Sequence, residues 1–142
     1  MKSSPVILER TFNAPISKVW KAISDKNEMK HWYFDLKEFK PEVGFIFEFT
    51  GGPDDGKHYL HLCEVTEVEL ESKLTYSWRY DGYEGKSFVT FELFPKGDST
   101  LLRLTHTSLE TFPKSNPDFN VANFVAGWDE IIHVSLKNHL EK

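Results

Sequence analysis

The sequence predicts an α+β fold in which a curved antiparallel sheet of about six to seven strands wraps round a long C-terminal helix. Three observations lead to this prediction. Apolar residues recur at helical spacing over residues 119–140, near the end of the chain. Most of the chain before this segment alternates apolar and polar residues, as half-buried strands do. Two short helical patterns interrupt the strands, and both come directly after the first one.

The long helix is predicted over residues 119–140. The turn Asn116-Pro117-Asp118 gives a start signal, because Pro is tolerated in a first helical turn and Asp can cap free N–H groups. At about 1.5 Å per residue such a helix spans about 33 Å, the width of a small domain. Its apolar face is predicted from residues three and four apart, with further apolar residues beside them: Phe124, Trp128, Ile131 and Ser135, flanked by Val121, Val125 and Ile132.

The N-terminal part begins with a predicted strand, Val6–Phe12. Ser17 is expected to cap a first short helix, which Asp25-Lys26-Asn27 ends. Residues 28–32 read as a second helical turn, and residues 34–39 are predicted to be extended.

The middle of the chain reads as strands joined by turns. Phe45, Phe47 and Phe49 alternate with outward-facing residues, and the imperfect alternation of residues 58–70 suggests a strand with a bulge. Residues 51–56 have the composition of a hairpin loop. Three further strands are predicted from alternating residues: Leu74, Tyr76, Trp78 and Tyr80; Val89, Phe91 and Leu93; and Leu102, Leu104 and His106.

Composition limits the class of protein. The 142 residues fit a single domain, 1–142, and no linker or repeat divides them. The net charge of −5 argues against a nucleic-acid partner and against an electrostatic membrane partner. The single cysteine, Cys63, excludes an internal disulfide and fits a reducing compartment. With no secretory or membrane-spanning segment in the sequence, we expect a cytoplasmic protein.

Several short motifs occur in order along nearly the whole chain: Arg10-x-Phe12-x-Ala14-Pro15, Val19-Trp20, Trp32, Val43-Gly44, Leu74-x-Tyr76-x-Trp78, Val89-x-Phe91-x-Leu93, Thr100-x-Leu102-x-Leu104-Thr105-His106 and Gly127-Trp128. Together they resemble the SRPBCC (START-like) superfamily, and within it the family named for the activator of heat-shock-protein-90 ATPase. One departure is Val43-Gly44-Phe45, where many members have paired glycines. The resemblance implies a helix-grip fold, often with a cavity between sheet and helix. Eukaryotic chaperone activators of this family carry an additional N-terminal domain, so the resemblance alone does not imply co-chaperone activity.

Motifs for catalysis, metal binding or cofactor binding are not found. His58 and His61 are three apart on a predicted strand and would face opposite sides, and His133 and His139 are six apart on the helix, which is a poor match to one face. No nucleophile elbow occurs, and Cys63 has no catalytic signature around it. We therefore assign no catalytic residue, no metal ligand and no cofactor.

The remaining candidate is a ligand cavity between the sheet and the long helix, lined by aromatic rings. The alternative for each ring is ordinary core packing, and for each histidine a satisfied strand residue. Of the two histidines, His106 is the stronger candidate, because it shares an inward face with Leu102 and Leu104. The predicted ligand-binding residues are five rings, Trp32, Trp78, Phe91, Phe124 and Trp128, with His61 and His106 as polar contacts.

Three functions are open on this basis. The first, which rests on the resemblance and the aromatic content, is binding of a small hydrophobic or aromatic ligand in that cavity. The second is a protein-interaction module of the heat-shock-protein-90 ATPase activator type, with a protein partner or a second copy of the chain. The third is an enzyme resembling the superfamily's polyketide cyclases, for which Tyr76, Arg79 and His106 are available.

Overall fold

The computed structural model describes residues 5–34, 36–51 and 57–141. In chain order its elements are β1 (Val6–Phe12), α1 (Ile16–Ser24), α2 (Lys26–Met29), β2 (Ile46–Gly51), β3 (Tyr59–Glu69), β4 (Lys73–Tyr80), β5 (Ser87–Lys96), β6 (Ser99–Thr107), the 3₁₀ turns η1 (Leu109–Thr111) and η2 (Pro117–Phe119), α3 (Val121–Glu130), a π-helical segment η3 (Ile131–Leu136) and α4 (Lys137–Leu140). The hairpin loop predicted over residues 51–56 lies, apart from Gly51, outside the described residues.

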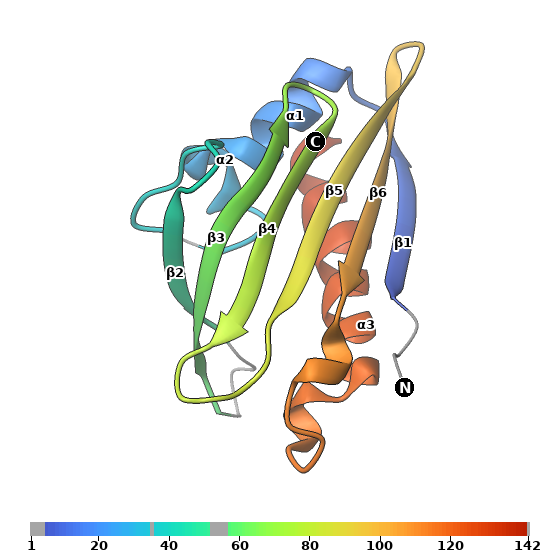
Figure 1. Ribbon diagram of the computed structural model, residues 1–142. Coiled ribbons are helices and arrows are strands. Elements are labelled where there is room, and N and C mark those ends of the chain that lie inside the picture. The colour runs from blue at the N-terminus through green and yellow to red at the C-terminus, as the bar shows by residue number, and fades with distance from the viewer. Residues whose placement is uncertain (1–4, 35, 52–56, 142) are drawn as a thin grey trace.

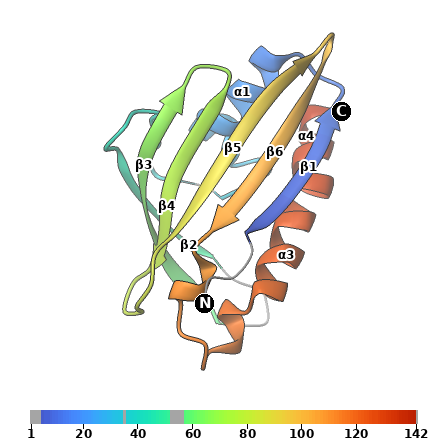
Figure 2. The same ribbon diagram turned by 45° about the vertical axis from the view of Figure 1, so that its right-hand side comes forward.

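The six strands of the described residues form one curved antiparallel sheet in the order β1-β6-β5-β4-β3-β2. The C-terminal helix, made of α3, η3 and α4, runs along one face of this sheet (Figures 1 and 2). The short helices α1 and α2 lie near the end of that helix, and the start of α3 lies at the opposite end of the sheet (Figure 1). The predicted fold class, with two short helices after the first strand, is confirmed.

Alternation along the strands decides which side chains face the helix. In β2, the side chains of Phe47 and Phe49 are buried, whereas the side chain of Ile46 points to solvent and is 71% exposed. The predicted bulge in β3 occurs between Val65 and Glu67, where its register against β4 shifts. The inward residues of β5 and β6 are those that the alternation predicts: Val89, Phe91, Leu93, Leu102, Leu104 and His106.

The buried face of the C-terminal helix differs from the prediction. Ile131 and Ser135 are only partly buried, and the buried residues recur every fourth position. At 3.6 residues per turn, a step of four residues drifts by about 40° round an α-helix. The wider π turn at Ile131–Leu136 reverses this drift, so a spacing of four stays on one face. The buried series is Phe124, Trp128, Ile132, Leu136 and Leu140.

The predicted N-terminal ends of two helices also differ from those in the structure. The long helix begins at Val121, where the side chain of Asn120 accepts a hydrogen bond from the N–H of Ala122, and the predicted start signal instead opens η2. The cap position of α1 is Pro15, which offers no side-chain hydrogen bond, and Ser17 lies inside the helix.

The segment 34–39 contains no strand among its described residues. Two buried side chains, Leu36 and Phe39, hold it against the core in place of a strand ladder. In the part of the chain that the structure describes, no helix is both long and apolar enough to cross a membrane.

Candidate functional site

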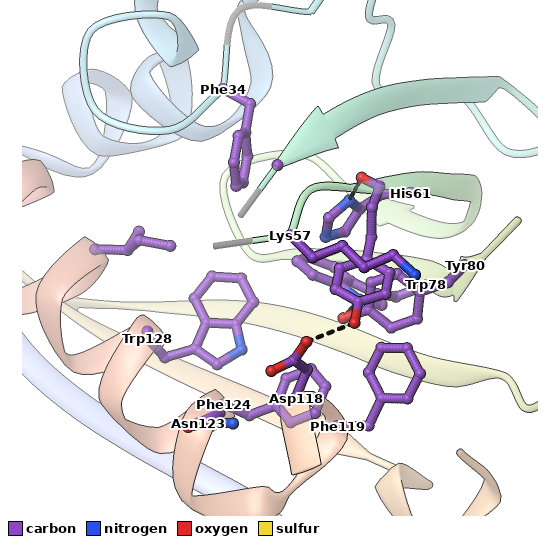
Figure 3. Close-up of a pocket in the computed structure, with 14 residues that line it drawn as sticks. Phe34, Lys57, His61, Trp78, Tyr80, Asp118, Phe119, Asn123, Phe124 and Trp128 are labelled. Carbon is purple, nitrogen blue, oxygen red and sulfur yellow. Dashed lines mark hydrogen bonds between the residues drawn. The ribbon is translucent and has the colours of Figure 1, made fainter. Parts of the chain in front are cut away.

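A pocket of about 470 Å³ opens between the sheet and α3, at the end where α3 begins (Figure 3). Strands β2, β3 and β4 supply one wall, and η2 and α3 supply the other. The residues that line it are Phe34, Gly51, Lys57, Tyr59, His61, Trp78, Tyr80, Asp118, Phe119, Asn123, Phe124, Gly127, Trp128 and Ile131.

Aromatic rings make most of the wall. Trp78 on β4 and Trp128 on α3 approach each other across the interior, with ring centroids 5.7 Å apart. Phe34 reaches the pocket from the connection between α2 and β2 (Figure 3). Its ring lies over Gly51, where an added Cβ would come within 2.7 Å of Cε1 of Phe34. The absence of a side chain at Gly51 therefore makes room for this ring.

Gly127 leaves the helical side of the pocket open. It lines the pocket from the middle of α3, and a Cβ built at this position would meet nothing within 4 Å. A glycine inside a helix destabilises it by roughly 0.5–1 kcal/mol relative to alanine. No packing contact compensates for this loss, and the exposed Gly127 leaves this edge of the pocket uncovered.

His61 is the buried polar residue of the wall. Strand register pairs it with Phe49 on one side and with Tyr80 on the other, and it is 5% exposed. Its Nδ1 lies 2.9 Å from the carbonyl oxygen of Tyr59, and since a carbonyl can only accept, Nδ1 carries the hydrogen. Burial lowers the pKa of His61 to about 4, against the opposing effect of neighbouring carbonyls, so the ring is neutral at pH 7.

Polar groups gather at the rim. The hydroxyl of Tyr59 donates a hydrogen bond of 2.5 Å to Oδ2 of Asp118 and accepts one of 3.2 Å from Nδ2 of Asn116. This pair joins the start of β3 to η2, directly before α3. Nζ of Lys57 donates to the hydroxyl of Tyr83 at 2.7 Å, and both groups are exposed or half-exposed. The rim thus carries one cation and one anion beside an aromatic interior.

His106 lies behind the wall. Nε1 of Trp128 donates to its Nδ1 at 3.0 Å, so Nε2 carries the ring hydrogen and donates to Oγ of Ser87 at 2.7 Å. The hydroxyl of Ser87 in turn donates to the carbonyl oxygen of Trp78 at 2.9 Å. Burial lowers the pKa of His106 to about 3, so this satisfied network contains a neutral ring.

The structure brings four of the seven predicted site residues together in the pocket: His61, Trp78, Phe124 and Trp128. Trp32 does not line it, since its Nε1 donates to the carbonyl oxygen of Ala22 at 2.8 Å within the core. Phe91 is 2% exposed and packs between Trp32 and Trp128. His106 has no exposed surface and does not line this pocket, and both of its ring nitrogens have partners within the protein.

Sequence reasoning missed ten of the fourteen residues that line the pocket. Tyr59 and Tyr80 could have been found, because each continues the inward alternation of its strand next to His61 and Trp78. Phe34 and the residues of η2 lie in irregular segments, where no periodicity marks the buried side. The missed lining residues are Phe34, Gly51, Lys57, Tyr59, Tyr80, Asp118, Phe119, Asn123, Gly127 and Ile131.

The residues considered for cyclase-like chemistry do not meet at this pocket. Tyr76 is 1% exposed, and its hydroxyl shares a hydrogen bond of 2.7 Å with that of Tyr33. Arg79 is exposed on β4 and does not line the pocket. Burial raises the pKa of the Cys63 thiol, which opposes thiolate formation. Among the described residues, no group of three or more His, Cys, Asp or Glu side chains could hold a metal ion.

The family model described as "Activator of Hsp90 ATPase homolog 1-like protein" matches residues 13–141. The chain belongs to this family. The resemblance inferred from the motifs is thereby confirmed. No curated protein sequence matches the chain.

Solved structures of the same fold cover nearly all of the chain. MLL2253 from Mesorhizobium loti is 28% identical, with a TM-score of 0.78 and 97% of each chain covered. BH1534 from Bacillus halodurans is 26% identical, with a TM-score of 0.75 and 98% of each chain covered. CalU16 from Micromonospora echinospora is 24% identical, with a TM-score of 0.72, and the match covers 96% of this chain and 75% of that one. At this identity the likeness to CalU16 concerns the fold alone.

Proposed function

We propose that this member of the Activator of Hsp90 ATPase homolog 1-like family binds a small, largely aromatic ligand in the pocket between β2–β4 and α3. The observation that carries the proposal is a pocket of about 470 Å³ walled by aromatic rings, with charged groups only at its rim. Ligand sites are typically concave and apolar, with volumes of about 300–1,000 Å³ and a few polar groups that fix orientation.

The indole N–H groups of the two tryptophans are not available to a ligand, because each already donates a hydrogen bond within the protein. Nε1 of Trp78 donates to the hydroxyl of Tyr80 at 2.9 Å, and Nε1 of Trp128 donates to His106. Both indoles therefore offer their rings to the pocket. Aromatic molecules pack favourably against such surfaces in offset-stacked or edge-to-face arrangements.

Gly127 supports the same proposal. A protein selected for stability alone gains from a side chain at an open helical position, because alanine is the better helix former. An open, exposed position at the edge of an aromatic pocket is useful when a ligand occupies the space.

The two other functions receive no comparable support. The three residues considered for cyclase-like chemistry lie apart from the pocket. For a protein-interaction module, no described surface feature identifies a partner.

The test is a fluorescence titration with N-phenyl-1-naphthylamine, a neutral aromatic probe whose emission rises in apolar surroundings. We expect saturable enhancement with the unmodified protein. Gly127→Phe places a ring in the pocket and should weaken binding at least tenfold. Ala126→Phe adds the same ring to an exposed position of α3 that does not line the pocket, and should bind as the unmodified protein does. Absence of saturable binding, or equal binding by all three proteins, would contradict the proposal.

A further inference from the structure

We propose that Nε2 of His61 accepts a hydrogen bond from the ligand, so that the ligand is an aromatic compound carrying a hydroxyl group. This inference rests on the proposed function and names the ligand class of the same pocket. It starts from the tautomer. Because Nδ1 donates to the carbonyl oxygen of Tyr59, the neutral ring keeps its lone pair on Nε2.

That lone pair is open to the pocket. The ring's hydrogen-bond partners among the described residues are the backbone carbonyls of Tyr59 and Phe49, which only accept, so neither donates to Nε2. Since the ring lines the pocket, the pocket is where Nε2 is accessible. Figure 3 shows the His61 ring facing the space between Phe34 and Trp128.

Neighbouring rings fix this orientation. The His61 ring stacks on Phe49 with centroids 4.5 Å apart, and Trp78 and Tyr80 contact its other sides at 4.9 and 4.8 Å. The imidazole cannot turn away from a ligand without disturbing this cage. A preorganised acceptor of this kind discriminates between ligands, since a ligand that displaces water without donating a hydrogen bond leaves a buried acceptor unsatisfied.

The two tyrosine hydroxyls of the wall already have protein partners, although that of Tyr80 keeps its own hydrogen and can still donate to a ligand. The hydroxyl of Tyr80 accepts from Trp78, and the hydroxyl of Tyr59 donates to Asp118. Lys57 and Asn123 are exposed at the mouth of the pocket. His61 therefore supplies the acceptor in the buried part of the wall, and a hydroxyl group on the ligand's aromatic body is the donor that fits it.

The experiment compares 1-naphthol with 1-methoxynaphthalene by calorimetric titration. The two share an aromatic body, and only the naphthol can donate. We expect the unmodified protein to prefer 1-naphthol on the order of tenfold, as loss of one hydrogen bond to a buried acceptor implies. His61→Phe should bind both compounds with equal affinity.

An NMR measurement on the unmodified protein keeps the inference testable if His61→Phe fails to fold. In a long-range proton–nitrogen spectrum, Nε2 should appear as the unprotonated nitrogen of His61. Its resonance should move upfield on addition of 1-naphthol and not on addition of 1-methoxynaphthalene.

The outcomes separate the two proposals. Equal affinity for both compounds, with binding still lost in Gly127→Phe and no selective change at Nε2, would overturn the role of His61 and leave the pocket as a ligand site. If neither compound binds, or Gly127→Phe binds both unchanged, the proposed function fails and this inference fails with it.

Discussion

The indole N–H of Trp128 donates a hydrogen bond of 3.0 Å to Nδ1 of His106, a histidine with no exposed surface. Through Ser87, the same histidine is connected to the backbone of Trp78. One buried network therefore holds both tryptophans, whose rings contact each other in the wall of the pocket. His106 thus acts as a positioning residue for the wall, because it makes no contact with the pocket itself.

Replacing this histidine should be costly. His106→Phe keeps a ring of similar size but leaves Nε1 of Trp128 without an acceptor and removes one of the two hydrogen bonds of Oγ of Ser87. Each unsatisfied buried group costs about 1–3 kcal/mol, so we expect the free energy of unfolding to fall by roughly 2–4 kcal/mol. Urea denaturation measures this change. Ser87→Ala should lose less, and a loss below about 0.5 kcal/mol in His106→Phe would show that the network contributes little.

Stability should depend on pH through the two buried histidines. The folded-state pKa values of His61 and His106 lie near 4 and 3, below the ordinary value of about 6.5. Between pH 6.5 and 4 the unfolded chain binds protons at these positions that the folded chain does not. The free energy of unfolding should therefore decrease as pH falls through this window, by on the order of 1 kcal/mol per pH unit for each histidine.

Other groups titrate in the same range, so the measurement compares variants. Urea denaturation of the unmodified protein and of His61→Phe at several pH values should give a slope that is smaller in the variant by about one proton. Equal slopes would mean that His61 is protonated equally in the folded and unfolded chains.

Gly85 is a position where an added methyl group should be harmful. Its φ of +102° is unfavourable for other residues, and a Cβ would come within 2.5 Å of the carbonyl oxygen of Thr111 in η1. We expect Gly85→Ala to lower the free energy of unfolding by about 2–3 kcal/mol. Gly97→Ala is the matched control, since Gly97 also has a positive φ but open space around its Cβ position. Similar losses in both variants would contradict the close contact.

Gly127→Ala should have the opposite effect. The position has ordinary helical geometry with no steric barrier, so alanine should raise the free energy of unfolding by about 0.5–1 kcal/mol. Thermal or urea denaturation would detect the gain. A destabilised variant would mean that the backbone at Gly127 needs the freedom of glycine.

The fold could be predicted because its signals are local and repetitive. Alternation along β2, β5 and β6 gives the inward face directly, and a period near four identifies the C-terminal helix. The details of that helix could not be predicted. The face centred on Ile132 and Leu136 depends on the π turn at Ile131–Leu136, which simple helical periodicity does not contain.

The site was harder to predict than the fold. Periodicity indicates which side of a strand faces the helix, but not how far along the helix a residue lies. Phe91 and His106 face inward as expected, yet they lie in packed core beside the pocket. Phe34 and Phe119 reach the pocket from irregular segments, where the chain path itself must be known.

The most direct test of ligand binding uses the four indole N–H signals in a two-dimensional proton–nitrogen NMR titration with 1-naphthol. Trp78 and Trp128 line the pocket, whereas Trp20 and Trp32 do not and serve as internal references. Binding in the pocket should shift the signals of Trp78 and Trp128 along a common saturation curve and leave the other two nearly unchanged. If no indole signal shifts, or all four drift together without saturation, the pocket is not a binding site for aromatic ligands of this class.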